Sequence, residues 1–567
     1  MRLILLLLLL AVAANGGVFD SLSKKVKGVF GGEGSFGEKL KNATIVGFRK
    51  LFNNTAVSGF RQRLKSMKAK VMKTLELSPE MLKSLKERLK HIANKTAAAL
   101  VVTSLLQWPK HAFHTLRQRP HFQLLRPIKQ DKVKEEGDSI SDINELNGVG
   151  QELFQSDIAL TKLQAEEIVE EIEEEASEGN RTKRQAFKDG TYPRKLWSEG
   201  VNYYFHPYSS REMRSAFVKG AKLWEQDTCI DFRESSYAKD RIKVFPEDGC
   251  WSYVGRLGNE QALSLGRGCE AVSIAAHEIG HALGFFHTMS RHDRDEYITI
   301  NTANIKPDWL DQFTKETTRT NYNYGMTYDS GSIMHYGARS ASRNKQPTMV
   351  PMDVRYQETL GSPFISFIDL SMLNEHYNCK AKCNKETSAK CERGGFPHPR
   401  DCSKCICPGG YSGKTCTERP SGCGKTVQAS SEWETLKDTL GDGRINEDFT
   451  KCHYWIQSPQ NTQIEVRLVS FSEGVATDGC TYAGVEIKTN EDQTLTGYRF
   501  CAPEDAGITL RSYTNLVPIM TYNRARTTTA VLEYRYGHIG KYASDIRTVR
   551  SKTTSCHYHY NDYYNNS

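Results

Sequence analysis

One eleven-residue segment, residues 277–287, constrains this chain more than any other feature. It reads His-Glu-Ile-Gly-His-Ala-Leu-Gly-Phe-Phe-His. On a helix, His277 and His281 are four residues apart and share one face, so both imidazoles can reach one ion. Gly284 lets the chain leave the helix, because glycine adopts the left-handed conformation cheaply, and the turn brings His287 round as a third ligand.

This ligand set predicts a catalytic metal. Three neutral imidazoles leave the fourth position for water, which is the catalytic pattern for Zn²⁺, and one zinc per subunit is expected. Zinc lowers the pKa of that water towards about 7. Glu278 follows the first ligand and is the expected general base, which takes the water's proton and passes it to the leaving amine. The alternative is a helix whose histidines only fill the core or the surface, but five fixed positions match by chance in on the order of one sequence in 10⁴ to 10⁵.

A second element follows at Ser332-Ile333-Met334-His335-Tyr336. An extended zinc motif followed by a methionine-containing turn defines the metzincins. Met334 is expected to form the hydrophobic floor beneath the metal. Tyr336 is expected to approach the metal as a weak ligand and to hydrogen-bond the oxyanion of the tetrahedral intermediate.

From about residue 185 to Cys379 the chain resembles the astacins, a family of metzincin zinc endopeptidases. Besides the zinc motif and the methionine turn, the resemblance lies in four blocks: residues 224–232, 249–255, 261–269 and 291–295. It implies an α+β metzincin catalytic domain over residues 185–379, with disulfides Cys229–Cys379 and Cys250–Cys269. Where the family often carries a basic side chain that selects acidic residues just after the scissile bond, this chain has Gly361-Ser362-Pro363. We therefore expect a small or neutral residue there.

The start of the chain predicts secretion. Arg2 is followed by an unbroken apolar run over residues 3–12 and then by small residues, which is typical of a secretory signal peptide, here residues 1–14. The run is too short to span a bilayer, which needs about 20 residues, and no later stretch is long enough. An extracellular protein without a membrane span is expected, with glycosylation triplets at five asparagines: Asn42, Asn53, Asn94, Asn180 and Asn565.

Cysteine placement separates a propeptide from the rest. Residues 1–228 contain no cysteine, and all 15 follow. Residues 15–184 are the expected propeptide, which ends at Arg181-Thr182-Lys183-Arg184, a sequence that subtilisin-like proprotein convertases cut. Cleavage after Arg184 would make Gln185 the mature N-terminus.

Within that region lies Phe154-Gln155-Ser156-Asp157. It resembles the Phe-x-Gly-Asp motif of astacin zymogens, whose aspartate occupies the water site of the zinc. Ser156 replaces the glycine, so the backbone is expected to differ there. Asp157 is expected to ligate the zinc in the zymogen only and to cause latency by displacing the water.

The remaining cysteines predict two further modules. Residues 380–418 resemble an EGF-like domain, which implies the pairs Cys383–Cys402, Cys391–Cys405 and Cys407–Cys416; six cysteines alone permit fifteen pairings. Residues 423–536 resemble a CUB domain, an all-β sandwich, which implies the pairs Cys423–Cys452 and Cys480–Cys501. Strand-like alternation at 464–468, and similar patterns at 485–487 and 531–534, agree with this.

The tail, residues 537–567, has no apolar period and is expected to be disordered. It holds Cys556, which is left over once the modules have used 14 of the 15 cysteines. Cys556 is therefore either free or links two chains in a disulfide-bonded dimer. The formal net charge of +9 over 567 residues is weak evidence for a nucleic-acid partner, and none is expected.

Together these features predict a multidomain, secreted zinc endopeptidase made as a zymogen and activated by a proprotein convertase. Its mechanism would be Glu-assisted attack of zinc-bound water on peptide bonds of extracellular proteins. The order of modules is similar to that of nematode astacins, which implies a matrix, cuticle or eggshell substrate. The alternative is a catalytically inactive extracellular adhesion or scaffold protein that has kept the fold.

Overall fold

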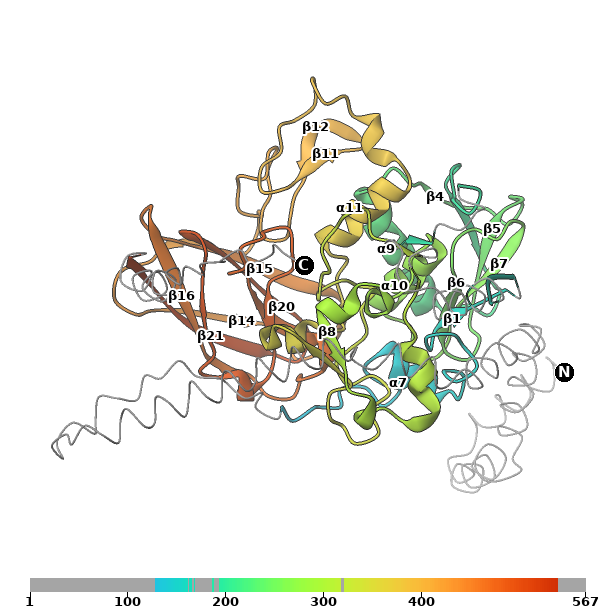
Figure 1. Ribbon diagram of the computed structural model, residues 1–567, viewed down its shortest axis with the longest axis horizontal. Helices are drawn as coiled ribbons and strands as arrows, with labels where there is room; N and C mark the ends of the chain where they lie inside the picture. The colour runs from blue at the N-terminus through green and yellow to red at the C-terminus, as the bar shows by residue number, and fades with distance from the viewer. Residues whose placement is uncertain are drawn as a thin grey trace, which may run out of the picture.

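The computed structural model describes residues 128–161, 163–165, 168, 186–187 (backbone only), 193–317 and 321–538. We name four parts by their residues: the N-terminal segment (128–161), the central domain (193–379), the disulfide-rich segment (380–418) and the C-terminal β domain (423–538). Figure 1 shows the central domain on the right, the C-terminal β domain on the left and the disulfide-rich segment at the top. The N-terminal segment, in blue to cyan, runs along the bottom of the view and then enters the central domain, where Ile158–Ala159 joins its sheet.

A six-stranded sheet forms one layer of the central domain. Its order is β1-β6-β7-β5-β3-β4, and β1 comes from the N-terminal segment and pairs in parallel with β6. The strands β3, β4, β5 and β7 form parallel pairs, whereas β6 runs antiparallel to β7. The bounds are β1 Ile158–Ala159, β3 Val201–Phe205, β4 Phe232–Glu234, β5 Arg241–Phe245, β6 Cys250–Tyr253 and β7 Glu260–Leu265.

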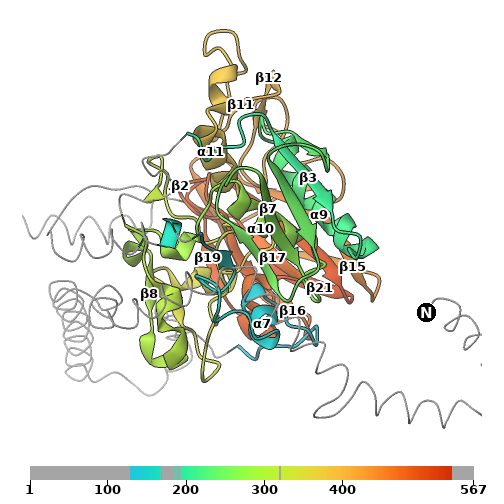
Figure 2. The same cartoon turned by 90° about the vertical axis from the view of Figure 1, so that its right-hand side faces the viewer.

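Two helices pack together beside this sheet (Figure 2). In α9 (Arg211–Gln226) the buried residues recur every three or four positions, from Met213 through Phe217 to Trp224, so one face of the helix enters the core. The Ser210 side chain caps its N-terminus by accepting from the Met213 amide. Trp224 donates through its indole N–H to the carbonyl of Ala276 at 2.8 Å, which ties α9 to α10 (Val272–Ala282).

The other helices, strands and turns before the C-terminal β domain, apart from those of the disulfide-rich segment, are short. They are α7 Ile140–Leu146, α11 Phe367–His376, β2 Ala186–Phe187 with β9 Asn321–Tyr322, and β8 Ile298–Ile300 with β10 Met349–Pro351. The 3₁₀ turns are η1 Thr288–Ser290, η2 Arg294–Glu296, η3 Thr302–Asn304, η4 Pro307–Phe313, η5 Val354–Thr359 and η6 Cys379–Lys382.

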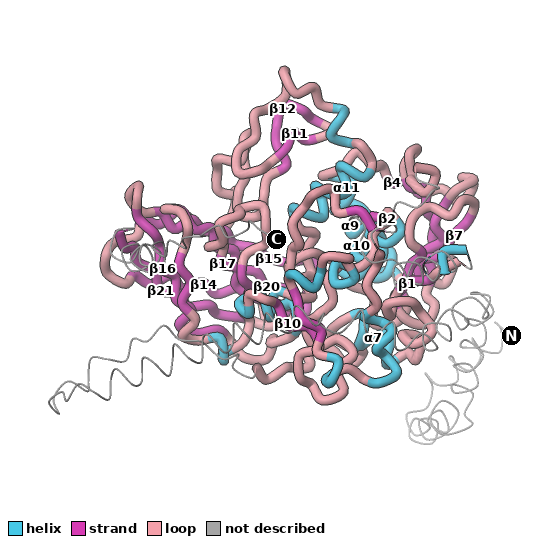
Figure 3. Tube along the Cα trace, in the orientation of Figure 1, coloured by secondary structure: helices cyan, strands magenta, loops and turns pink. Residues whose placement is uncertain are grey.

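The C-terminal β domain consists of two sheets around its own core; strands dominate it, whereas the central domain mixes helices, strands and long loops (Figure 3). One sheet has the order β13-β15-β20-β17-β18 and the other β14-β21-β16-β19. The bounds are β13 Thr426–Gln428, β14 Glu434–Leu440, β15 Ile445–Gln457, β16 Thr462–Phe471, β17 Ala483–Ile487, β18 Tyr498–Phe500, β19 Thr509–Arg511, β20 Leu516–Ala525 and β21 Thr528–His538, with turns η7 Asp478–Cys480 and η8 Pro503–Asp505. In β16 the alternation predicts the buried face correctly, because Ile464, Val466 and Leu468 are fully buried.

Strand β17 differs from its expected half-buried pattern, because all five of its residues are buried. Glu486 points away from the β-domain core, yet it is only 7% exposed. Its carboxylate accepts from Arg499 Nε at 2.9 Å, and Arg499 donates to Ser362 Oγ of the central domain at 2.5 Å. The second face of this sheet is therefore covered by the central domain.

The disulfide-rich segment contains the hairpin β11 (Phe396–His398) and β12 (Asp401–Ile406). Arg400 at its turn donates to the carbonyls of Glu225 and Thr228 in the central domain. Seven disulfides lie in the described chain, at the pairings implied by the resemblance: Cys229–Cys379, Cys250–Cys269, Cys383–Cys402, Cys391–Cys405, Cys407–Cys416, Cys423–Cys452 and Cys480–Cys501.

Several predictions concern residues that the structure does not describe: the signal peptide, the cleavage site at Arg184 and Gln185, the five glycosylation triplets and Cys556. The expected start of the tail at 537 needs a correction, since β21 continues to His538 by pairing with β16. None of the helices in the described part of the chain is long and apolar enough to cross a membrane.

Candidate active site

Helix α10 and the turn after it bring the three predicted histidines together. His277 and His281 lie one turn apart on the helix, which ends at Ala282. Gly284 then adopts a φ of +112°, and a Cβ there would lie 3.1 Å from the ring of His376. The left-handed turn predicted from the glycine is thus present, and His287 follows it. All three imidazoles are buried.

The hydrogen bonds of these rings fix which nitrogen carries the proton. The Nδ1 atoms of His277 and His281 lie 2.6 Å from the carbonyl oxygens of Ile333 and Phe285. A carbonyl oxygen can only accept, so each Nδ1 must be protonated and each Nε2 presents a lone pair. His287 Nδ1 lies 2.9 Å from the side-chain oxygen of Gln155, so this Nδ1 is also protonated and its Nε2 also presents a lone pair.

The three Nε2 atoms converge on one point. His277 Nε2 lies 3.1 Å from that of His281 and 3.2 Å from that of His287. The carboxylate of Asp157 completes the group, 3.1 Å from both His277 and His287 and 3.4 Å from His281. Four acceptors facing one another without a proton between them repel unless a cation lies among them.

These distances fit zinc. Ligands bound about 2.0–2.1 Å from a tetrahedral zinc lie roughly 3.3 Å apart, which is close to the separations observed. The donor set of three imidazoles and one carboxylate is also one that zinc accepts. Burial lowers the pKa of His287 to about 3, which favours the neutral form that a metal ligand requires.

Asp157 reaches this point through an unusual backbone. Gln155 and Ser156 have φ values of +49° and +78°, the left-handed region that favours glycine. Ser156 is therefore a serine held in a conformation that favours glycine. Its amide donates to the Gln312 side chain at 2.7 Å, and Gln155 donates to Glu316 at 3.0 Å. Two side chains of the central domain thus hold the turn in place.

Glu278 lies beside the histidines with no hydrogen-bond partner for either carboxylate oxygen among the described residues. It is fully buried. Burial and then the charge of Asp157 raise its pKa well above the usual range. A buried carboxylate without a partner is costly, so its position is consistent with a group whose partner arrives with the substrate.

Tyr336 and Met334 lie at the same site. The Tyr336 hydroxyl donates to Asp157 at 2.5 Å, so it occupies the position from which it could reach an oxygen in place of that carboxylate. Met334 is buried below the helix. A Cβ on Gly280 would lie 2.6 Å from the Met334 sulfur, which explains why a glycine stands between the two helical histidines.

The sequence analysis misses the residues that orient the ligands. It treats Gln155 only as part of the Asp157 motif, although the Gln155 side chain contacts His287. It does not single out Gln312 and Glu316, which hold the turn. Their contacts join residues more than 150 positions apart, and no local pattern indicates such pairs.

Comparison with known proteins also indicates a zinc peptidase. The family model for the astacin peptidases matches residues 189–378. The chain is 49% identical over 424 residues to zinc metalloproteinase nas-31 of Caenorhabditis elegans, covering 74% of this chain and 69% of the relative. It is 37% identical over 404 residues to nas-32 of the same organism, covering 70% and 60%.

Among solved structures, the chain is similar to high choriolytic enzyme 1, a hatching enzyme zinc-protease from the medaka Oryzias latipes. The identity is 32%, the match covers 34% of this chain and 94% of that chain, and the TM-score is 0.30. From the match to nas-31 together with the family model, the chain belongs to the astacin family and is a zinc metalloendopeptidase.

Proposed function

We propose that this chain is a secreted zymogen in which the N-terminal segment blocks its own catalytic centre. The observation that carries the proposal is the convergence of His277, His281 and His287 on Asp157, beside a buried and unpartnered Glu278. A site of this kind has the ligands, the base and the blocking group in one place.

Within this proposal, His277, His281 and His287 hold the zinc. When bound, the metal supplies Lewis acidity, which polarises the scissile carbonyl and acidifies water. Glu278 takes the proton of the attacking water and delivers it to the leaving amine. Tyr336 donates its hydroxyl to the oxyanion once Asp157 has left. Met334 supports the metal site from below.

Activation follows from the same contacts. Asp157 occupies the fourth ligand position, so water and substrate are excluded while the N-terminal segment is bound. A proprotein convertase would cut after Arg184 and make Gln185 the new N-terminus. The signal peptide, residues 1–14, would direct the chain out of the cell.

The remaining parts are proposed to select and hold substrates. We assign residues 380–418 to an EGF-like module and residues 423–536 to a CUB module, on the cysteine pattern and the two-sheet architecture. The substrates are proposed to be extracellular proteins of a matrix, cuticle or eggshell, by the resemblance to nematode astacins. Cys556 is proposed to be free or to join two chains, and the five asparagines are proposed to carry glycans.

An inactive adhesion or scaffold protein is the second candidate. It would not need a metal-ligand set with three protonated Nδ1 atoms, nor a base kept unpartnered in the core. Both are costly to maintain in a fold that has no use for them.

The test is hydrolysis of gelatin or casein by the convertase-activated full chain, with and without a zinc chelator. Glu278→Ala should lower kcat by about 10²-fold or more, because general-base catalysis contributes roughly that factor. Glu375→Ala, an exposed carboxylate of α11, is the matched control and should keep full activity. Full activity in Glu278→Ala, or in the presence of chelator, would refute the mechanism. Absence of activity in the unmodified protein would favour the scaffold.

A further inference from the structure

The loop formed by residues 329–339 carries two parts of the active site. The carbonyl of Ile333 lies 2.6 Å from Nδ1 of His277 and orients that ring. Further along, the Tyr336 hydroxyl reaches Asp157. Because Tyr336 is the oxyanion donor in the proposed function, the conformation of the 329–339 loop decides how well that donor is placed.

The C-terminal β domain contacts the start of this loop through Thr496. The Asp329 carboxylate is only 1% exposed, and it accepts from the Thr496 hydroxyl at 3.0 Å and from the Thr496 amide at 3.3 Å. It also accepts from the Gly331 amide at 3.0 Å. A Cβ on Gly331 would lie 2.3 Å from the Thr496 side chain, so the two domains touch where a larger residue would not fit. A buried carboxylate that loses a donor is costly, and Asp329 therefore ties the loop to Thr496.

Thr496 is itself held from both domains. Its carbonyl accepts from the Tyr356 hydroxyl of the central domain at 3.2 Å and from the Asn490 side chain of the β domain at 3.0 Å. Asn490 also donates to the Tyr356 hydroxyl at 2.8 Å. The Thr496 hydroxyl is thus presented to Asp329 from a fixed backbone.

Asp478 of the β domain contacts the end of the loop. Its carboxylate accepts from the Arg339 amide at 2.6 Å and from the Arg339 guanidinium. The same guanidinium pairs with Glu358 of the central domain at 3.4 Å. A Cβ on Gly337 would lie 2.6 Å from the Cβ of Asp478, so the contact is as close here as at Thr496. The β domain therefore holds both ends of the loop that carries Tyr336.

The middle of the loop is held by the central domain. Asp369 of α11 accepts from the Ser332 hydroxyl at 2.6 Å and from the Ile333 amide at 2.9 Å. A change at the ends of the loop should therefore shift Tyr336 and leave the zinc ligands in place. Neither end contact involves the N-terminal segment, so activation removes neither.

We propose that Thr496 and Asp478 of the C-terminal β domain are positioning residues for Tyr336. They fix the two ends of the loop between which Tyr336 lies. Turnover of bound substrate then depends on a domain other than the one that carries the zinc ligands and the base. This inference rests on the proposed function, in which Tyr336 stabilises the oxyanion.

The test measures kcat and KM of the convertase-activated full chain on a quenched peptide, per active site titrated with a peptide hydroxamate. Thr496→Val removes the hydroxyl and keeps the shape of the side chain. We expect kcat to fall about fivefold and KM to change less than about twofold, because a misplacement of about 1 Å costs up to about 10²-fold in rate. Thr496→Ser keeps the donor and should retain most of kcat. Thr494→Val is the matched control in the same loop, since the Thr494 hydroxyl donates to Asp492, and it should keep full activity.

A double-mutant cycle tests whether the effect passes through Tyr336. Tyr336→Phe alone should lower kcat by about 10²-fold, the usual cost of one oxyanion donor. In that background Thr496→Val should lower kcat by less than about twofold, because no hydroxyl is left to misplace. A residue with a merely structural role would give the same fold-loss in both backgrounds.

Asp478→Asn tests the other end of the loop and replaces Thr496→Val if that variant is not secreted. The amide turns one acceptor into a donor, so one of the two contacts with Arg339 is lost, and kcat should fall in the same Tyr336-dependent way. An unchanged kcat in both variants, or an equal loss with and without the Tyr336 hydroxyl, overturns the inference. Full kcat in Tyr336→Phe would instead contradict the proposed function.

Discussion

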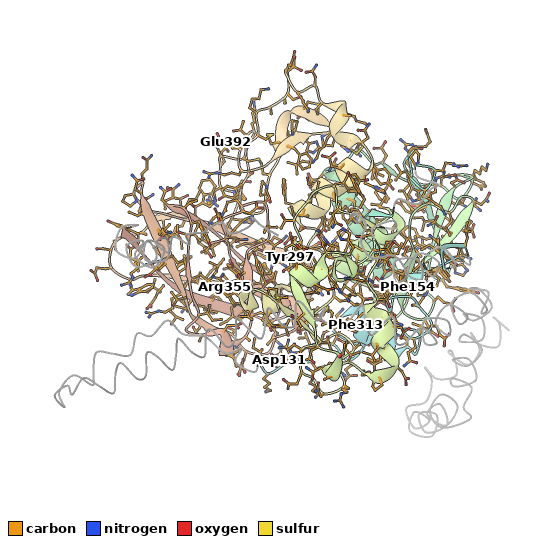
Figure 4. All side chains as sticks on the ribbon, in the orientation of Figure 1. Asp131, Phe154, Tyr297, Phe313, Arg355 and Glu392 are labelled. Atoms are coloured by element: carbon orange, nitrogen blue, oxygen red, sulfur yellow. A yellow bond between two sulfur atoms is a disulfide. The ribbon has the colours of Figure 1, made fainter. Side chains whose placement is uncertain are left out.

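The inner and outer parts of the N-terminal segment contact different partners. The inner part, residues 154–160, is buried throughout, and Asp157 faces the metal ligands. The outer part, residues 131–138, is mostly half-buried or exposed and contacts the C-terminal β domain. Asp131 exchanges hydrogen bonds with Ala476, at 2.8 and 2.9 Å, and Val133 packs against the β-domain core. Figure 4 labels Asp131 and Phe154, one in each part.

This difference separates two roles. Asp157 of the inner part occupies a ligand position of the metal site, and its carboxylate is fully buried from water. The outer part makes partly solvated hydrogen bonds, which contribute only about 0.5–1.5 kcal/mol each. We infer that latency depends on the inner part, whereas the outer part positions the segment across two domains.

The largest expected effect is on latency. In an uncut chain carrying Arg184→Ala, the further change Asp157→Ala should raise peptide hydrolysis at least about tenfold, because it removes a charge-assisted contact of roughly 1.5–3 kcal/mol. The measurement is the initial rate with a quenched peptide. Asp131→Ala, which removes a carboxylate from the outer part, is the control and should stay latent. Equal rates for Asp157→Ala and the uncut parent would mean that Asp157 does not block the site.

A smaller effect is expected at Ser156. Its φ of +78° costs a residue with a Cβ about 1 kcal/mol or more relative to glycine. Ser156→Gly should therefore stabilise the uncut chain and raise its Tm by about 2 °C. Ser156→Ala keeps the Cβ and should show no such gain in differential scanning calorimetry. A gain in both variants would assign the effect to the hydroxyl instead of the backbone.

The metal ligands could be predicted from the sequence because their geometry is local. The spacing of His277 and His281 is set by the helix, and that of His287 by the turn at Gly284. Asp157 lies 120 positions from His277, so spacing says nothing of their contact, and only the resemblance to astacin zymogens suggested it. The disulfide pairs were likewise implied by resemblance, since the cysteines alone leave many pairings open.

The contacts between domains could not be predicted in this way. Alternation identifies the buried face of β16, where one side faces solvent. It fails at β17, because Glu486 is covered by a domain whose docking no local pattern encodes.

The smallest effect on activity is expected at Asp138. A substitution there tests whether the inner and outer parts of the N-terminal segment act separately. This carboxylate accepts from the amides of Val133 at 3.0 Å and Lys134 at 2.8 Å, besides the hydroxyl of Tyr482. Asp138→Ala should free both amides, so their hydrogen exchange in the uncut chain should become about fivefold faster or more, as expected for the loss of about 1 kcal/mol. Hydrolysis by the same uncut chain should change by less than about twofold, because Asp157 still occupies the ligand position. Glu135→Ala, a carboxylate of the same turn, should alter neither quantity. If Asp138→Ala abolished latency, the outer contacts would be holding the inner part in place, and the two parts would act as one unit.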